Sequence, residues 1–125
     1  MNDEGVIVGD YIFQSSAQNP PVNYGFLLRD EKYTAIFIAG SDQGGLGTQV
    51  NGISNFNAVV GVFSDATGYF HGLLWTNGTA YELDYPSAVY NEAHTINDLG
   101  VITGSYSTDP TGTLIHGYVA YPRGW

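Results

Sequence analysis

The 125-residue sequence contains no cysteine, which excludes both a disulfide framework and a cysteine-ligated zinc site. Basic residues are scarce: Arg29, Lys32 and Arg123 stand against twelve acidic residues, and the net charge is −9. Nucleic acids and anionic membrane surfaces are bound through basic patches, so neither is an expected partner. Cations and neutral ligands such as sugars or lactones suit this charge better.

Long apolar runs are missing as well. No stretch approaches the roughly 20 residues that a membrane helix needs. The opening MNDEGVIVGD lacks the basic and apolar parts of a secretory signal, so the chain is expected to be cytoplasmic, or else a mature or trimmed form. No stretch longer than about one turn repeats its apolar residues with the helical period of 3.6. The sequence therefore predicts almost no helix.

What the sequence does contain is glycine, tyrosine and a repeat. Its 17 glycines and 10 tyrosines predict β-structure with many turns. Residues 53–75 read ISNFNAVVGVFSDATGYFHGLLW, and residues 96–121 read INDLGVITGSYSTDPTGTLIHGYVAY. These are two versions of one segment, and such self-similarity is the signature of a repeat architecture.

Glycines mark the repeat along the chain. Two sets of three recur in apolar, β-branched or aromatic stretches, namely Gly9, Gly61 and Gly104, and then Gly25, Gly72 and Gly117. Residues 33–40 match 80–87, and residues 48–55 match 92–98, which completes a unit of four short strands. The sequence thus predicts a single domain of ten strands in two and a half units, with approximate bounds 1–52, 53–95 and 96–125.

Alternation along the strands predicts where the side chains point. Around Gly72, the side chains of His71, Leu73 and Trp75 share one face, while Leu74 on the opposite face is also apolar. A sheet that is apolar on both faces is packed between other sheets, as in a propeller or another multilayer arrangement. The pattern therefore predicts an all-β, propeller-like protein.

The repeat resembles a known type. The pattern IN-D-x-G-x-I-x-G-x-Y, followed by H-G-F/Y-L, x-D-Y-P-x-A and T-I-N, resembles the HAF-type repeat of bacterial, often extracellular, proteins. The residues that carry the resemblance are Ile96, Asn97, Asp98, Gly100, Ile102, Gly104, Tyr106, His71, Gly72, His116, Gly117, Asp84, Tyr85 and Pro86. The resemblance covers nearly the whole chain and implies β-propeller-like blades of four strands and an extracellular location, but no particular activity. The first unit departs from the pattern, because Tyr24 replaces the histidine and Ala39 the proline.

The strand count predicts self-association. A closed propeller needs at least four blades, so two and a half units cannot close a ring. Unpaired strand edges also pair readily with another chain. We therefore expect a homo-oligomer, most simply a homodimer that completes the ring. The alternative is a monomer with three-fold symmetry, either a β-prism or a β-trefoil, which would need twelve strands.

Histidines and aspartates are the candidate catalytic and metal-binding residues. His71 and His116 take equivalent positions, where they could act as general bases or metal ligands, and His94 stands outside the repeat. The alternative for each is a packing role with one backbone hydrogen bond. Asp65 and Asp109 open equivalent turns, where an aspartate commonly caps the turn. Their oxygen-rich loops could also hold calcium.

A candidate ligand site comprises Tyr106, Trp75, Glu82 and Asp84. Glu82 and Asp84 share a strand face about 7 Å apart, which would also suit a glycosidase pair. The first predicted function is a self-assembling repeat module that binds a neutral small ligand or a sugar. The alternative is a calcium-assisted hydrolase of lactones or esters, by analogy with propeller enzymes. The sequence has no G-x-S-x-G, phosphate loop or H-E-x-x-H motif.

Overall fold

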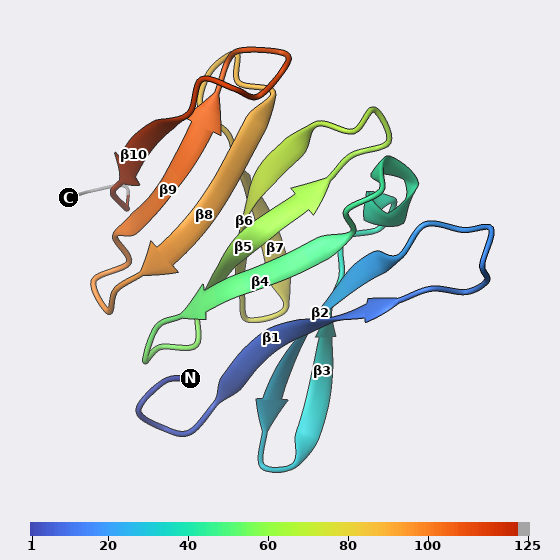
Figure 1. Cartoon of the computed structure of the whole chain (residues 1–125). Helices are drawn as coiled ribbons and strands as arrows, with labels where there is room; N and C mark the ends of the chain where they lie inside the picture. The colour runs from blue at the N-terminus through green and yellow to red at the C-terminus, as the bar shows by residue number, and fades with distance from the viewer. Residues whose placement is uncertain (123–125) are drawn as a thin grey trace.

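The computed structural model describes residues 1–122 and shows an all-β protein, as predicted (Figure 1). Ten strands form three antiparallel sheets. The first sheet contains β1 (Ile7–Phe13), β2 (Val22–Arg29) and β3 (Lys32–Ile36). The middle sheet contains β4 (Thr48–Ile53), β5 (Val59–Ser64), β6 (Phe70–Thr76) and β7 (Thr79–Leu83). The third sheet contains β8 (Tyr90–Ile96), β9 (Ile102–Ser107) and β10 (His116–Ala120). Helical structure in the described residues is limited to the 3-10 segment η1 (Ser41–Gly44).

The sheets are offset by one strand from the sequence repeat. In the sequence, β4 and β8 are the last strands of their units. In the structure, each pairs instead with the first strand of the following unit: β4 pairs with β5, and β8 pairs with β9. The middle sheet therefore holds a complete set of four strands in the order β4-β5-β6-β7. Within residues 1–122, the first sheet has no counterpart of β4 beside β1, and the third sheet has no counterpart of β7 beside β10.

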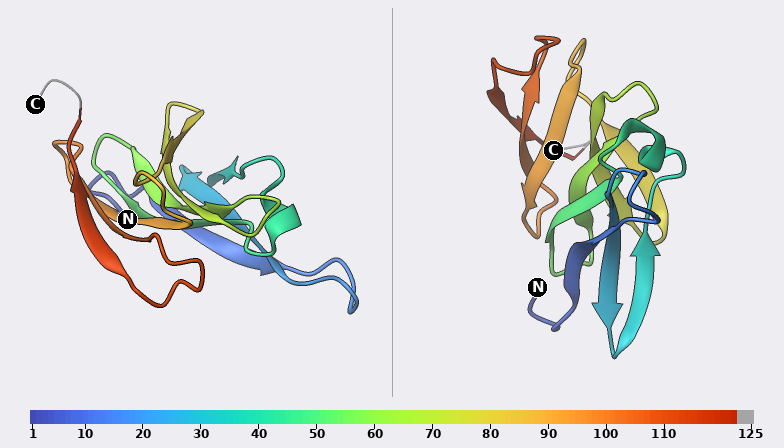
Figure 2. Two further views of the ribbon diagram at one scale, coloured as in Figure 1. Left: turned by 90° about the horizontal axis from the view of Figure 1, so that it is seen from above. Right: turned by 45° about the vertical axis from the view of Figure 1, so that its right-hand side comes forward.

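The sheets follow one another in space in the order of the chain, with the first and third sheets packed on the middle one (Figures 1 and 2). One edge strand from each sheet lies along the same side of the molecule, where β4 contacts both β1 and β8 (Figure 1). The N-terminal residues lie near the end of β4. None of the helical structure in residues 1–122 is long and apolar enough to span a membrane.

Two hydrophobic clusters hold the three sheets together. The first, between the first and middle sheets, comprises Val6, Leu27, Ile36, Val50, Val59 and Leu73. The second, between the middle and third sheets, is built on Val60, Ala93 and Ile102. Val59 and Val60 are neighbours in β5 that point to opposite faces, and both are fully buried. The middle sheet is therefore apolar and covered on both sides, as the alternation in the sequence predicted.

In the first and third sheets, glycine in the first strand of the repeat makes room for a ring from the next strand. A Cβ atom on Gly104 would lie 2.5 Å from the ring of Tyr118, and one on Gly9 would lie 3.1 Å from the ring of Phe26. Each aromatic side chain thus crosses the backbone of its neighbouring strand, which no residue with a side chain would allow.

Candidate functional site

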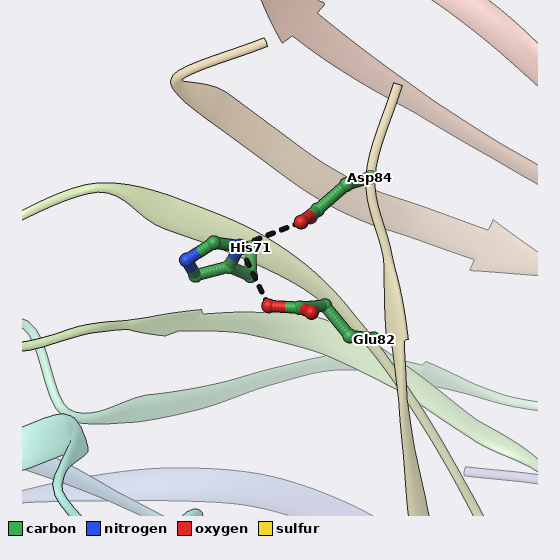
Figure 3. Close-up of side chains that lie close together, drawn as sticks. All are labelled: His71, Glu82 and Asp84. Carbon is green, nitrogen blue, oxygen red and sulfur yellow. Dashed lines mark hydrogen bonds and ion pairs between the residues drawn. The ribbon is translucent and has the colours of Figure 1, made fainter. Parts of the chain in front are cut away.

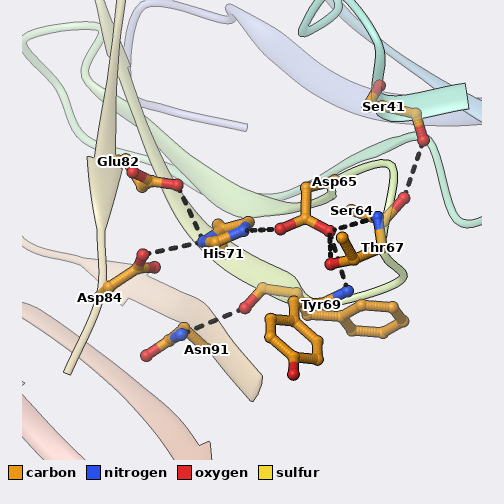
Figure 4. A network of polar contacts seen from close by, with 10 residues as sticks. Ser41, Ser64, Asp65, Thr67, Tyr69, His71, Glu82, Asp84 and Asn91 are labelled. Atoms are coloured by element: carbon orange, nitrogen blue, oxygen red, sulfur yellow. Dashed lines mark hydrogen bonds and ion pairs between the residues drawn. The ribbon is translucent and has the colours of Figure 1, made fainter. Parts of the chain in front are cut away.

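Three carboxylates gather around His71 of β6 at one end of the middle sheet (Figures 3 and 4). The β6–β7 hairpin has a two-residue turn at Asn77-Gly78, with φ angles of 52° and 79°. This turn fixes the register in which Gly72 pairs with Leu83 and Leu73 with Glu82. Asp84, which follows β7, therefore lies beside His71, and Glu82 lies two residues away on the same face.

His71 is held by carboxylates on both sides of its ring. Its Nδ1 atom lies 2.8 Å from Asp84 Oδ2 and 2.8 Å from Glu82 Oε1 (Figure 3). Its Nε2 atom lies 2.7 Å from Asp65 Oδ2 (Figure 4). The His71 side chain is only 15% exposed, whereas that of Glu82 is 52% exposed. Phe63 of β5 stacks on the imidazole, with ring centroids 5.2 Å apart.

The turn between β5 and β6 positions Asp65 for this contact. Asp65 Oδ1 accepts hydrogen bonds from the backbone N–H groups of Thr67 (2.9 Å) and Tyr69 (3.1 Å), and from the Thr67 hydroxyl. Gly68 supplies the positive φ of 89° that closes the turn. Because Oδ1 is occupied by the turn, Oδ2 is directed at His71 (Figure 4).

The charges at this site shift two pKa values in opposite directions. Burial disfavours the charged imidazolium, but the carboxylates of Asp65, Asp84 and Glu82 outweigh that effect and raise the pKa of His71. Partial burial also opposes ionisation of Asp65. Hydrogen bonds from the Thr67 hydroxyl, from His71 and from the backbone outweigh it and hold the pKa of Asp65 well below its usual range. The site therefore favours an imidazolium among ionised carboxylates.

The third sheet repeats only part of this arrangement. His116 takes the position of His71 and Asp109 that of Asp65, but β10 has no outer strand beside it within the described chain. His116 is exposed, with its ring 5.3 Å from that of Tyr106. The Asp109 carboxylate accepts hydrogen bonds from Thr111 and Thr113, which hold its pKa well below the usual range. Asp109 therefore caps its turn, as Asp65 does.

The remaining predicted site residues lie apart from His71. His94 occupies the bulge of β8 between Ala93 and Thr95, and its Nε2 atom lies 3.0 Å from Ser105 Oγ. Tyr106 stacks on Tyr85, with centroids 3.8 Å apart and an interplanar angle of 9°. Trp75 packs against the cluster between the first and middle sheets. Of the predicted residues, the structure brings together His71, Asp65, Glu82 and Asp84.

A ladder of side chains across the three sheets was missed by the sequence analysis. Asp3, Asn55 and Asp98 occupy the same place in three equivalent turns. Asn55 Oδ1 accepts the N–H of Asp3 (2.7 Å), and Asp98 Oδ1 accepts the N–H of Asn55 (2.8 Å). The Asn55 amide also donates to both carboxylates, at 2.9 Å to Asp3 and 2.8 Å to Asp98. The recurring dipeptides Asn2-Asp3, Ser54-Asn55 and Asn97-Asp98 were the available signal.

The face of the first sheet that points away from the middle sheet is aromatic. Tyr24 stacks between Tyr11 (5.6 Å) and Phe37 (4.5 Å). A hollow of about 590 Å³ on this face is lined by Tyr11, Tyr24, Gly25, Phe26, Tyr33 and Ala35. Tyr33 is 71% exposed and Tyr11 55% exposed, so these rings form an apolar surface that the chain itself leaves uncovered.

Comparison with family models, with curated proteins and with solved structures finds no match to this chain. The HAF-type resemblance therefore stays a prediction based on the repeat itself. What the geometry defines is an all-β protein with a histidine–carboxylate site in its four-stranded middle sheet and a three-stranded sheet on either side of it.

Proposed function

We propose that this chain is a self-assembling β-repeat module whose series of sheets is continued by a second copy. One observation carries the proposal: each end sheet has one strand fewer than the middle sheet. Across residues 1–122, the first sheet lacks the strand that corresponds to β4, and the third sheet lacks the strand that corresponds to β7. In the described chain, β1 and β10 are consequently edge strands with unpaired backbone groups, and such edges pair readily with other chains. Two copies would together supply six sheets, enough for a propeller-like ring.

The uncovered faces support this proposal. The aromatic face of the first sheet corresponds in the repeat to the face of the middle sheet on which Val59 and Leu73 are fully buried. At the other end of the series, the third sheet exposes Ile115 (57%) and Val119 (54%). A head-to-tail contact between copies would cover both apolar surfaces with the face-to-face packing that already joins the sheets within one chain.

The ladder of Asp3, Asn55 and Asp98 predicts that the contact between copies depends on pH. Inside the chain, an asparagine amide separates the two carboxylates. A head-to-tail junction would set Asp98 of one copy beside Asp3 of the next, with no amide between them. Like charges at this spacing repel each other, so the association should strengthen when the pH falls or when Asp98 is replaced by asparagine.

Sedimentation equilibrium over a range of protein concentrations tests the assembly. We expect a homodimer at micromolar concentration, and a dissociation constant at least about tenfold weaker for Tyr33→Ser, because that ring lies on the uncovered aromatic face. Tyr81→Ser is the matched control, since Tyr81 is also an exposed tyrosine on an outer strand (51%) but lies on β7 of the middle sheet. A monomer at all concentrations up to about 100 μM would contradict the proposal.

The same aromatic face favours a second function, the binding of a neutral sugar. Stacked tyrosine rings around an open hollow suit the apolar face of a sugar ring, which brings no charge to a protein of net charge −9. A titration with neutral disaccharides, followed through the tyrosine resonances by NMR, tests this function. A monomeric protein whose Tyr24 and Tyr33 signals shift on titration would favour the ligand over the second copy.

The proposal of calcium-assisted hydrolysis has its support at His71, whose carboxylate partners resemble those of a general base. Hydrolysis of lactones and aryl esters, measured with calcium and with chelator, tests it directly. His71→Gln should abolish any calcium-dependent turnover, while His116→Gln should leave it unchanged.

A further inference from the structure

We propose that Nδ1 of His71, Oε1 of Glu82 and Oδ2 of Asp84 form a binding site for one divalent transition-metal ion of the zinc class. This site is independent of the assembly of copies. It also differs from the calcium pair predicted from the sequence, Asp65 and Asp109, which cap separate turns. Among the described residues, His71, Glu82 and Asp84 form the one group of three histidine or acidic side chains whose ligand atoms converge within 4.8 Å.

The three ligand atoms all lie within 4.8 Å of one another, close enough to surround one ion. Both carboxylate oxygens lie 2.8 Å from Nδ1 (Figure 3). Tetrahedral coordination with bonds of about 2.0–2.1 Å places ligand atoms about 3.3 Å apart. The two Nδ1–oxygen distances need to lengthen by only about half an ångström to accept the ion, and Glu82, at 52% exposed, is free to move. The site then keeps one position open on its solvent side.

A metal ion would satisfy both carboxylates more fully than a proton does. Nδ1 carries at most one proton, which the two oxygens that lie 2.8 Å from it have to share. The hydrogen-bonding geometry is met by Asp84, and the second carboxylate is left as a bare ion pair. A metal ion in place of that proton would bind both oxygens and the nitrogen together.

Asp65 prepares the imidazole for this role without being a ligand. Its Oδ2 atom lies 2.7 Å from Nε2 and holds a proton there, so that when the ion displaces the Nδ1 proton of the imidazolium, the freed lone pair faces Glu82 and Asp84 (Figure 4). A carboxylate on the far nitrogen of a metal-binding histidine is the usual outer partner, because it fixes the tautomer and raises the basicity of the ligand. Asp65 is therefore a positioning residue.

The ligand set selects the type of metal. An imidazole nitrogen suits zinc and its transition-metal neighbours, whereas calcium and magnesium prefer oxygen ligands alone. Two carboxylates neutralise the charge of a divalent ion, and no lysine or arginine forms an ion pair with them in residues 1–122. A bound ion would strengthen the link between β6 and the end of the outer strand β7, which the hairpin ladder and the contacts of His71 with Glu82 and Asp84 already join.

Isothermal titration of the tag-free full chain with zinc chloride at pH 7 is the central test. We expect saturable one-to-one binding in the micromolar range, much weaker binding of magnesium and calcium, and a melting temperature several degrees higher at a hundredfold excess of zinc over its dissociation constant. His71→Gln should remove the binding. His116→Gln is the matched control, because His116 has the equivalent place without the two acidic partners. Asp65→Asn should weaken binding about 10- to 100-fold.

NMR of the unmodified protein keeps the proposal testable if a variant does not fold. Zinc should shift the imidazole signals of His71 and leave those of His94 and His116 in place. The proposal is overturned if zinc gives no saturable binding up to about 1 mM. It is also overturned if zinc shifts His94 or His116 instead of His71, or if His116→Gln loses as much affinity as His71→Gln.

Discussion

The carbonyl oxygen of Leu83 lies only 2.5 Å from the position that a Cβ atom on Gly72 would occupy. Gly72 is therefore glycine because the outer strand β7 approaches its backbone. Gly25 has the same relationship to Ile36 in the first sheet, where the carbonyl oxygen would lie 2.7 Å away. Gly117 is the third member of the set, and its nearest neighbour, the carbonyl oxygen of Gly104, is 3.9 Å away because no outer strand covers β10 in the described chain.

Gly72→Ala should destabilise the fold, while Gly117→Ala should not. The added methyl group at residue 72 would push β7 away from β6, at a cost of about 1–3 kcal/mol in the free energy of unfolding. At residue 117 the same methyl group meets open space, and the change should be neutral or slightly stabilising. Urea denaturation of the two variants at low protein concentration measures the difference. Equal losses would mean that a strand covers β10 in solution.

Asp10→Asn should stabilise the protein at neutral pH. Burial raises the pKa of Asp10, against the weaker effect of a hydrogen bond from the Val50 backbone. A carboxyl group with a raised pKa in the folded state favours folding when it is protonated, and that contribution is lost as the pH rises through this pKa. The asparagine removes the penalty, so we expect Asp10→Asn to be more stable than the wild type at pH 7.

The gain should disappear at acidic pH. Below about pH 4, Asp10 is protonated in both the folded and unfolded states, and the two proteins should then melt together. Melting curves at pH 3.5 and pH 7 provide the check. A gain of the same size at both pH values would show that the effect comes from packing and not from the charge.

The His71 site shows how much of the site geometry could be predicted from the sequence. Asn77-Gly78 is a typical hairpin-turn dipeptide, and a two-residue turn fixes every pair along β6 and β7. Counting back from that turn pairs residue 76 with residue 79 and places residue 71 opposite residue 84. The contact of His71 with Asp84 therefore followed from the sequence, although the sequence analysis placed Glu82 and Asp84 in a candidate ligand site and named His71 separately as a candidate base or metal ligand.

Other features could not be obtained from the sequence. The bulges at Asn51 and His94 shift the registers of β4 and β8, and a bulge leaves no distinctive sequence mark. His94 therefore corresponds to Asn51, whereas aligning residues 48–55 with residues 92–98 from their first residues would pair it with Val50. The contacts of Asn55 with Asp3 and Asp98 join residues 52 and 43 positions apart, and they depend on how neighbouring sheets stack.

Asn91→Ala should be strongly destabilising. Asn91 is 1% exposed, its Oδ1 atom accepts the N–H of Tyr85 (2.8 Å), and its Nδ2 atom donates to the carbonyl of Phe70 (3.1 Å). The alanine would leave two backbone groups without partners, at a cost of about 2–4 kcal/mol in the free energy of unfolding. Guanidinium denaturation followed by circular dichroism measures it.

Asn91→Thr should recover part of the loss. Thr48 takes the equivalent place in β4, where its hydroxyl oxygen accepts the N–H of Ile38 at 3.0 Å. A threonine at residue 91 can accept the N–H of Tyr85 in the same way, although it does not reach the carbonyl of Phe70. If Asn91→Thr were no more stable than Asn91→Ala, the hydrogen bond to Tyr85 would not be the source of the effect.

Asn55→Asp should weaken the contact between successive sheets in a pH-dependent manner. The Asn55 amide donates to the carboxylates of both Asp3 and Asp98. An aspartate there replaces two charge-assisted hydrogen bonds with two repulsive contacts. Asp3 and Asp98 are exposed and residue 55 is partly buried, so solvent screens the repulsion only in part and we expect a loss of about 1–2 kcal/mol at pH 7. The variant should regain stability relative to the wild type below about pH 4, where the carboxyl groups are protonated.

Asp98→Asn is the control, since it keeps an oxygen acceptor for the Asn55 N–H while removing one charge. Thermal melts of the three proteins at pH 7 and pH 3.5 distinguish the cases: a loss for Asn55→Asp that is independent of pH would mean that the ladder acts through shape alone.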